Sequence, residues 1–438
     1  MIRYTKRIVY LFIELLILPF FLLSFFIIAI LKRKRNNGNV LPRLLWGVDP
    51  IINNKYFSEA LAQKGFYSKT MMNGFYSSIN RKEDYDIYVD ELLPFKLPLP
   101  FVAYYAFLYA IYHFDIIHHP ANGFLLRFTR LLQGKEGTFI RLSGCKNIVL
   151  PYGSDIWLYS QIKDLRFRHA LLISYPDAGK QEKLIEKKLY YWITHSSIFI
   201  PFHQTEGVGY WDVLCYNGVC IDLQKWVKKD KSNILLKNGK DEVVKIIHSP
   251  NHRGVKGTEF IIDAVERLQK EGLKVELVLL EKVSNDVVKE IMDEADILVE
   301  QLLFAHGLSA VEGMAKGLTV VSNLENMPFS QVFRTYSYFN ECPIVSAGTS
   351  NITDVLRILI KNPALRKSLG DAGRLYVEKY HSYAFSYFFF NTLYRKIWYK
   401  EDIDLLNLFH PLNKNAYNFS LPVIQHPLVD SKLPDLTL

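Results

Sequence analysis

Residues 243–258 read VVKIIHSPNHRGVKGT, and residues 296–317 read DILVEQLLFAHGLSAVEGMAKG. Each stretch begins with a short apolar run of strand length, continues through a loop that contains glycine, and then changes to helical spacing. The first strand is expected to end at His248 and the second near Glu300. Repeated strand–loop–helix units of this kind predict a parallel sheet covered by helices.

The same alternation of short apolar strands and amphipathic helices extends over most of the 438 residues. A lysine-rich linker interrupts it near residues 222–242. We therefore predict an α/β protein with two doubly wound, Rossmann-like domains, at residues 41–225 and 226–380. Residues 381–438 are expected to form a terminal helix and tail that cross the two domains. Two such domains enclose a cleft at the carboxyl ends of their strands, where ligands bind.

Residues 1–40 predict a membrane anchor. Ile8–Leu31 is a nearly unbroken apolar run, and at 1.5 Å per residue it reaches about 36 Å, enough to cross a hydrocarbon core of about 30 Å. Four basic residues, Lys32–Arg35, follow directly, whereas a cleaved signal peptide has a shorter apolar core. We predict a single-pass helix at about residues 8–31 in the cell membrane, with the other domains in the cytosol. A helix lying in the membrane interface is the alternative.

The charge distribution agrees with a membrane partner. The formal charge is +9, and residues 1–40 hold seven basic side chains and one acidic one, so about +3 is left for the rest of the chain. Basic residues that flank an apolar run meet anionic lipid headgroups. No basic–aromatic module indicates nucleic-acid binding. The four cysteines form no C-x-x-C pair, which argues against a zinc ribbon, and we expect no metal site.

The loop after the strand at His248 has the composition of an anion-binding site. Arg253 and Lys256 supply two cations, and Gly254 and Gly257 allow the backbone to approach a ligand. The helix that begins at Thr258 adds its N-terminal N–H groups. The spacing matches neither a Walker loop nor a G-x-G-x-x-G fingerprint. The loop therefore predicts a binding site for a diphosphate. The alternative is an ordinary surface turn.

The second stretch predicts a complementary site. The amides of Gly307, Leu308 and Ser309 open a helix and can bind phosphate, while Glu312 on the same helix can accept both hydroxyls of a ribose. Gly317 gives the helix a sharp stop.

Taken together, the loop Arg253-x-x-Lys256-Gly257, the helix E-G-M-A-x-G at 312–317 and the strand T-V-V at 319–321 resemble the donor-binding half of family-4 retaining glycosyltransferases with the GT-B fold. The resemblance covers residues 245–323 closely and residues 43–400 loosely. It implies an enzyme of hexosyltransferase type that transfers a sugar from a nucleotide sugar and retains the anomeric configuration. It also implies that neither a cofactor nor an essential metal is needed.

Carried over by position, the resemblance assigns Arg253 and Lys256 to the leaving diphosphate and Glu312 to the ribose. Residues 304–309 would line the sugar and phosphate. One departure is Phe304, which stands eight residues before Glu312, where the family pattern has a first glutamate. Either Glu300-Gln301 replaces that glutamate, or its contact with the sugar is absent.

The first domain is expected to supply the acceptor side and the remaining catalytic groups. His118 and His119 end a predicted strand, and the resemblance places such a histidine against the donor sugar; a histidine there is otherwise a core residue. Tyr152 and Asp155 belong to a Y-G-S-D turn in which Asp155 would bind an acceptor hydroxyl or, alternatively, cap the next helix. Gly47 follows the first strand, where its loop would approach the donor phosphates.

The membrane anchor makes a lipid-linked or cell-surface glycan the expected acceptor. Two alternatives remain open from the residues. Asp84-Tyr85-Asp86 and Asp402-Ile403-Asp404 match the D-x-D letters of metal-dependent GT-A transferases. Phe304 is consistent with a catalytically inactive, membrane-bound homologue that binds nucleotide sugars as a partner protein.

Overall fold

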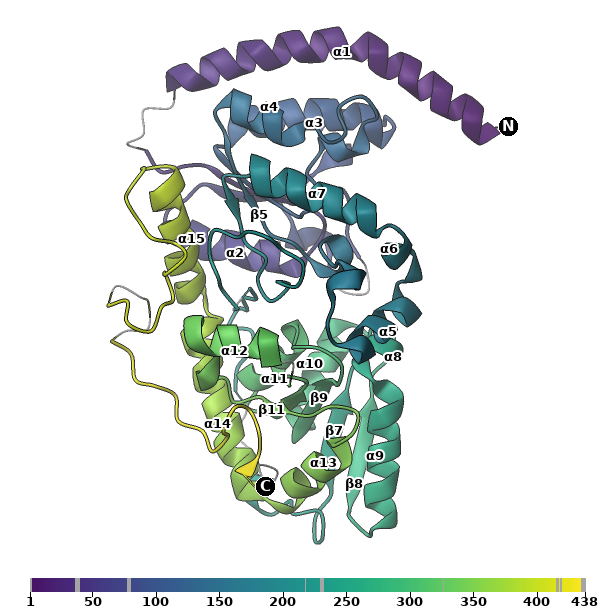
Figure 1. Cartoon of the computed structure of the whole chain (residues 1–438), viewed down its shortest axis with the longest axis vertical. Helices are drawn as coiled ribbons and strands as arrows, with labels where there is room; N and C mark the ends of the chain where they lie inside the picture. The colour runs from purple at the N-terminus through teal and green to yellow at the C-terminus, as the bar shows by residue number, and fades with distance from the viewer. Residues whose placement is uncertain are drawn as a thin grey trace.

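The computed structural model describes residues 2–35, 40–76, 80–216, 218–228, 232–325, 327–414, 417 and 420–434. Two parallel sheets form the centres of two α/β domains stacked one above the other (Figure 1). The first has the strand order β3-β2-β1-β4-β5-β6, and the second has the order β11-β10-β9-β7-β8. The predicted class of two doubly wound parallel domains is confirmed.

The N-terminal domain alternates strands and helices as the apolar pattern predicts. Its strands are β1 (Leu44–Val48), β2 (Ser68–Met72), β3 (Ile87–Tyr88), β4 (Ile116–His119), β5 (Lys146–Val149) and β6 (Ile198–Phe199). Its helices are α2 (Ile52–Ala62), α3 (Leu99–His113), α4 (Glu136–Ser143), α5 (Leu165–Ser174), α6 (Pro176–Lys180) and α7 (Glu182–His195). Every residue of β1 is buried, as expected for a central strand covered on both faces.

The C-terminal domain is built on the two motif-bearing stretches. Its strands are β7 (Val244–His248), β8 (Val275–Leu279), β9 (Ile297–Gln301), β10 (Thr319–Ser322) and β11 (Val345–Ser346). Its helices are α8 (Arg253–Lys256), α9 (Thr258–Lys270), α10 (Asn285–Glu294), α11 (Leu308–Ala315), α12 (Met327–Tyr336), α13 (Ile352–Lys361) and α14 (Pro363–Tyr380). Gly257 separates α8 from α9 with a φ of +72°, a conformation that favours glycine.

The chain returns to the N-terminal domain at its end. The helix α15 (Tyr383–Ile397) follows α14 directly and runs beside α2 (Figure 1). Phe390 of α15 meets the Trp46 ring edge-on at 4.8 Å, and the Tyr394 hydroxyl bonds His118 Nε2 at 2.9 Å. The crossing helix therefore ties the two domains together through a buried aromatic contact.

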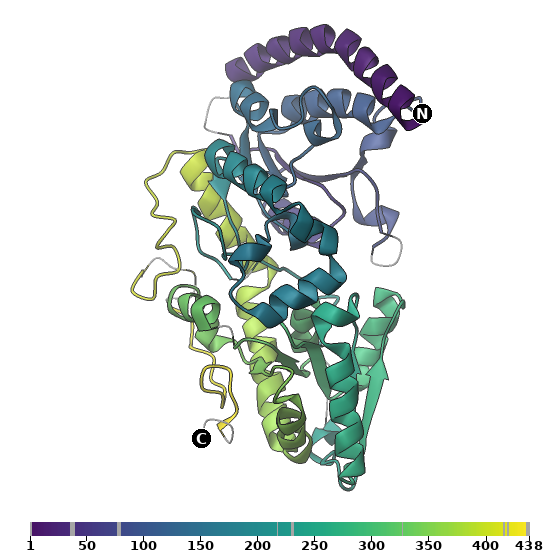
Figure 2. The ribbon, with the colours of Figure 1, turned by 45° about the vertical axis from the view of Figure 1, so that its right-hand side comes forward.

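The first helix, α1 (Ile2–Arg35), lies along the outside of the N-terminal domain (Figures 1 and 2). Its segment Ile8–Arg33 is long and apolar enough to cross a membrane. In the structure it packs on α3 and α4, where Phe21 meets Tyr104 at 5.1 Å and Phe25 meets Phe139 at 4.9 Å between ring centroids. That this helix crosses a bilayer stays a prediction from the sequence.

Candidate functional site

A cavity of about 550 Å³ lies between the two domains. Its walls come from α5 of the N-terminal domain, which contributes Arg166 and His169, and from α8 and the start of α9, which contribute Arg253 and Thr258. Cavities of this size between two α/β domains are common ligand sites. The anion-binding loop predicted from the sequence therefore lines an interdomain cavity, as its assigned role requires.

Arg253 occupies the first turn of α8 and is partly exposed. Its Nε donates to Glu259 and its Nη1 to Glu281, both at 2.8 Å. These carboxylates hold the pKa of the guanidinium above its ordinary value. Ion pairs at exposed positions are weak, so a diphosphate can exchange for either partner at small cost.

Lys256 and Glu300 are brought together beneath α8. The Lys256 ammonium donates to Glu300 Oε1, and the side chain of Glu300 is only 1% exposed. The same carboxylate accepts from Gly307 N–H at 3.2 Å and from the Ser309 hydroxyl at 3.2 Å. Glu300 therefore joins the lysine of the first motif to the helix N-terminus of the second, and both predicted motifs share one site.

Glu312 lies one turn further along α11 and is partly buried. Burial raises the pKa of its carboxyl to about 8. Its negative charge adds to the effect of burial in raising the pKa of Tyr56 on α2. The carboxylate assigned to a ribose therefore lies close enough to Tyr56 of the N-terminal domain to act on its charge.

Phe304 is a packing residue between the domains. Its ring stacks on Phe167 of α5 at 4.3 Å and meets Trp157 edge-on at 5.1 Å, and it is 5% exposed. Phe304 is predicted to line the sugar site, but in the structure its ring forms part of the aromatic contact between the domains. Glu300, which lies four residues earlier, is the carboxylate that reaches the N-terminus of α11.

The catalytic role expected of His118 and His119 is not supported by their surroundings. His118 stacks on Trp46 at 3.6 Å and bonds Leu45 O and the Tyr394 hydroxyl through its two ring nitrogens. His119 bonds Pro120 O and the Asn147 amide. Burial lowers the pKa of His118 to about 3 and that of His119 to about 4. Both are neutral core residues, the alternative that the sequence left open.

Asp155 caps its own turn. Its carboxylate accepts from Tyr152 N–H at 2.9 Å and from Ala121 N–H at 3.0 Å, and burial raises its pKa well above the ordinary value. These bonds join the loops after β4 and β5. The structure therefore supports capping rather than binding of an acceptor hydroxyl, because both carboxylate oxygens already accept from the backbone. Tyr152 packs against the main core.

Gly47 lies inside β1, where a Cβ would come within 2.1 Å of the Met71 carbonyl oxygen on β2. The prediction that it belongs to a loop near the phosphates is wrong: glycine is needed here for the close approach of two strands.

His203 was missed by the sequence analysis. It follows β6 in the N-terminal domain, and burial lowers its pKa to about 4, although the nearby Glu300 carboxylate favours the charged form. Its ring also lies 6.2 Å from that of Phe304. Its position just after a short apolar run was the available signal, but nothing in the local pattern distinguishes it from a surface residue.

The acidic triplets have ordinary structural roles. Asp84 pairs with Lys55, and Asp86 accepts from the backbone and hydroxyl of Thr70 at 2.9 Å. Asp404 accepts from Asn407 in the C-terminal tail. The chain also has two stacked parallel α/β domains. A GT-A transferase is built on a single nucleotide-binding domain. The GT-A alternative is therefore wrong.

A second cavity, of about 350 Å³, lies within the N-terminal domain between the segment after β4 and α7. Arg127, Lys187 and Lys188 line it together with the buried carboxyl group of Glu136, so basic groups are in excess. Arg127 is paired with Asp49, and Lys188 donates to Asn122 Oδ1 at 3.3 Å. The segment after β4 thus opens toward a small, positively charged hollow that the sequence did not predict.

Comparison with known proteins places the fold. No family model and no curated protein sequence matches the chain. Among solved structures, Anabaena Alr3699/HepE in complex with UDP and glucose is similar, with a TM-score of 0.50 and 11% identity over 80% of this chain and 99% of that one. A Rickettsia africae glycosyltransferase has a TM-score of 0.49 and 11% identity over 81% of this chain and 98% of that one. The first of these likenesses, together with the two stacked parallel α/β domains, shows that the chain has the GT-B fold.

Proposed function

We propose that the chain is a glycosyltransferase that uses a nucleotide sugar as donor. The observation that carries the proposal is the joining of Lys256, Glu300 and the N-terminus of α11 into one site beside the interdomain cavity. The similarity to a protein whose structure holds UDP and glucose supports it at the level of fold. Because one fold hosts many activities, the residues and not the fold must supply the chemistry.

In this proposal the donor diphosphate lies between Arg253, Lys256 and the first turn of α11. Departure of a nucleoside diphosphate develops negative charge, which the two cations and the helix N–H groups stabilise without an essential metal. When the donor binds, Lys256 must give up its ion pair with Glu300 and bind a phosphate oxygen instead. Glu312 accepts hydrogen bonds from the ribose hydroxyls. The transferred sugar is a hexose, and its anomeric configuration is retained.

The acceptor is proposed to be a lipid-linked or cell-surface glycan. The cavity lined by Arg127, Lys187 and Lys188 suits the phosphate of a lipid-linked sugar, because clustered cations bind phosphate through charge-assisted bonds. It lies in the domain that carries α1, so a membrane-bound acceptor would reach it over a short distance. We place both domains on the cytosolic side of the cell membrane, where the buried free cysteines stay reduced.

A catalytically inactive homologue is the second candidate. Two observations favour it: both cations of the donor site already have carboxylate partners, and Phe304 fills the position of the first family glutamate. Such a protein would bind nucleotide sugars without turning them over.

The experiment that separates the two candidates is a panel of radiolabelled nucleotide sugars offered with a membrane lipid extract. We expect wild-type protein to transfer label to lipid from one donor, and Glu312→Ala to lose that transfer. Binding of a donor without transfer or hydrolysis across the whole panel would establish the inactive homologue instead.

A further inference from the structure

Two charged side chains of α1, Glu14 and Lys32, face the N-terminal domain. Glu14 is fully buried, and its Oε2 accepts from the Tyr104 hydroxyl at 3.0 Å and from the backbone N–H groups of Arg130 and Leu131 at 2.9 and 3.1 Å. Between ring centroids, Phe21 on the same side contacts Tyr104 at 5.1 Å. One carboxylate thus fixes the first half of α1 to α3 and to the segment before α4.

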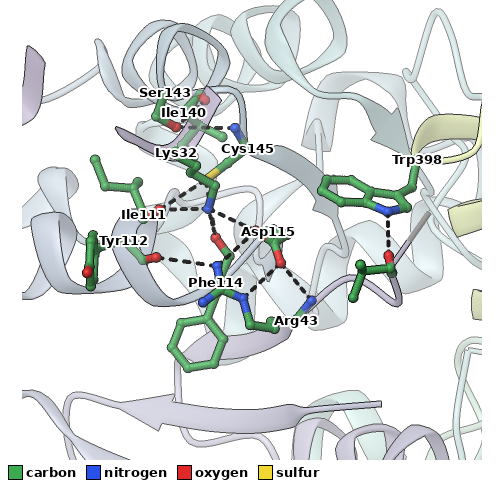
Figure 3. A network of polar contacts seen from close by, with 11 residues as sticks. Lys32, Arg43, Ile111, Tyr112, Phe114, Asp115, Ile140, Ser143, Cys145 and Trp398 are labelled. Carbon is green, nitrogen blue, oxygen red and sulfur yellow. Dashed lines mark hydrogen bonds and ion pairs between the residues drawn. The ribbon is translucent and has the colours of Figure 1, made fainter. Parts of the chain in front are cut away.

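The second half of α1 is fixed by Lys32 (Figure 3). Its ammonium donates to the carbonyl oxygens of Ile111 and Phe114 and lies 3.2 Å from the Asp115 carboxylate. Its side chain is completely buried. Arg33 adds a bond to Leu142 O at 2.9 Å. Both ends of the apolar segment are therefore bound to the N-terminal domain by buried polar contacts.

The opposite side of α1 is apolar and exposed. Its residues recur every three or four positions, as the outward face of one helix does. This outward face consists of Ile8, Leu11, Phe12, Leu15, Leu16, Phe20, Leu23, Phe26, Ile27, Ile30 and Leu31. Phe20, at its centre, is 74% exposed. At 1.5 Å per residue the outward face is about 36 Å long, and no charged side chain interrupts it.

An exposed apolar surface of this extent marks a site of association with another apolar phase. The inward side of α1 is apolar as well, apart from Glu14 and Lys32, so α1 differs from an ordinary surface helix in having an apolar outward side. The sequence places Arg3, Lys6 and Arg7 before the outward face and Arg33–Arg35 after it. The single acidic residue, Glu14, is turned away and bound. An apolar face with cations at both ends is complementary to an anionic lipid surface.

We propose that α1 is an in-plane membrane helix whose outward face lies in the boundary between headgroups and acyl chains of an anionic bilayer. A helix that crossed the bilayer would have to leave α3 and α4, which would carry Glu14 into hydrocarbon and separate Lys32 from Asp115 and from its two carbonyl partners. Both changes are unfavourable because charges without partners are poorly solvated in an apolar medium. The in-plane arrangement keeps every one of these bonds.

The helix α1 also follows the curvature of the N-terminal domain (Figures 1 and 2). Pro19 lies inside α1, and the helix is bent along the domain (Figures 1 and 2). A proline removes one backbone hydrogen bond and permits such a bend. The protein would then carry its N-terminal domain against the membrane. This inference does not depend on the proposed enzymatic activity.

The test measures the depth of three positions on the outward face. Ile8→Cys, Phe20→Cys and Leu31→Cys are labelled one at a time with a fluorophore in the full chain, whose four native cysteines are buried. Quenching by lipids brominated at known depths is read in vesicles of phosphatidylcholine and phosphatidylglycerol. We expect all three labels at one shallow depth of about 5–10 Å. Phe20 about 15 Å deep at the bilayer centre, with the other two at opposite surfaces, would overturn the proposal.

A second measurement tests the outward face and the lipid charge. The triple variant Leu16→Asp, Phe20→Asp, Leu23→Asp should weaken vesicle binding about tenfold or more, because three large apolar groups are lost from the contact. Wild-type binding should also weaken in vesicles of phosphatidylcholine alone. Unchanged binding of the triple variant would overturn the proposal.

The matched control changes three exposed apolar residues of the C-terminal domain: Leu236→Asp, Phe260→Asp and Leu375→Asp. This control should bind vesicles as wild type does. A loss of binding in the control equal to that of the α1 variant would contradict a specific role of α1.

Discussion

Lys256 of α8 is paired with Glu300 at the end of β9, inside the C-terminal domain. The carboxylate also accepts from Gly307 N–H, so it occupies the N-terminus of α11, where a diphosphate is expected. The protein itself therefore supplies an anion to its anion site. A bound donor must replace Glu300 as the partner of Lys256. Single and double substitutions of this buried pair therefore distinguish effects on stability from effects on activity.

Replacing only one member of this pair should destabilise the fold. Lys256→Met leaves the Glu300 carboxylate buried without its cation, and we expect a loss of about 3–5 kcal/mol in the free energy of unfolding. The double variant Lys256→Met/Glu300→Gln removes both charges and should regain most of that loss. Urea unfolding of the wild type, both single variants and the double variant measures the coupling. Additive losses would show that the pair does not interact.

Arg253→Ala should affect the donor and not the fold. Its ion pairs with Glu259 and Glu281 are exposed and screened by solvent, so their loss should change stability little. Loss of a charge-assisted contact to the leaving group should lower kcat/KM about 10²-fold. Arg267→Ala, which removes an exposed pair with Asp263 on α9, is the matched control. If the two variants had equal kcat/KM values, Arg253 would not belong to the donor site.

Donor binding should depend on pH through Glu312. Burial raises the pKa of its carboxyl to about 8, so the ligand-free group holds its proton at neutral pH, and only the ionised form accepts two hydroxyls. Affinity for UDP should therefore rise roughly tenfold or more between about pH 6.5 and about pH 8.5. Calorimetric titration at both pH values measures this change. Glu312→Gln should lose the rise, and a variant that keeps it would place the titrating group elsewhere.

Phe304→Ala should loosen the contact between the domains. The ring is stacked on Phe167 and lies against Trp157, and truncation of a buried phenylalanine costs about 3–5 kcal/mol. Phe260→Ala, at an exposed position, should cost less than about 0.5 kcal/mol. Thermal unfolding compares the two variants. A Phe304 variant as stable as the control would mean that this aromatic cluster does not hold the domains together.

Much of the fold could be predicted because parallel strands are short buried apolar runs with helices between them. The two motif loops were found for the same reason: each follows a buried strand and contains cations or glycine beside a helix start. Gly47 shows the limit of this reasoning, since only the strand pairing reveals that its neighbour is the Met71 carbonyl.

The histidines show a second limit. His118 and His119 end a strand as predicted, but the tertiary contacts with Tyr394 and Asn147 make them core residues. Those partners lie far away in the sequence, so no local pattern announces them. The inward position of Glu14 is of the same kind, because hydropathy counts a charge without showing which way it points.

The most direct test of the account follows sugar transfer by the Lys256→Met/Glu300→Gln variant, whose fold the paired substitution is expected to preserve. Wild-type protein and this variant are given the radiolabelled donor that the wild type accepts, together with membrane lipid extract. We predict labelled lipid and free nucleoside diphosphate from the wild type, and turnover lower by about 10² or more in the variant. Equal turnover by the two proteins, or no turnover of any nucleotide sugar by the wild type, would contradict it.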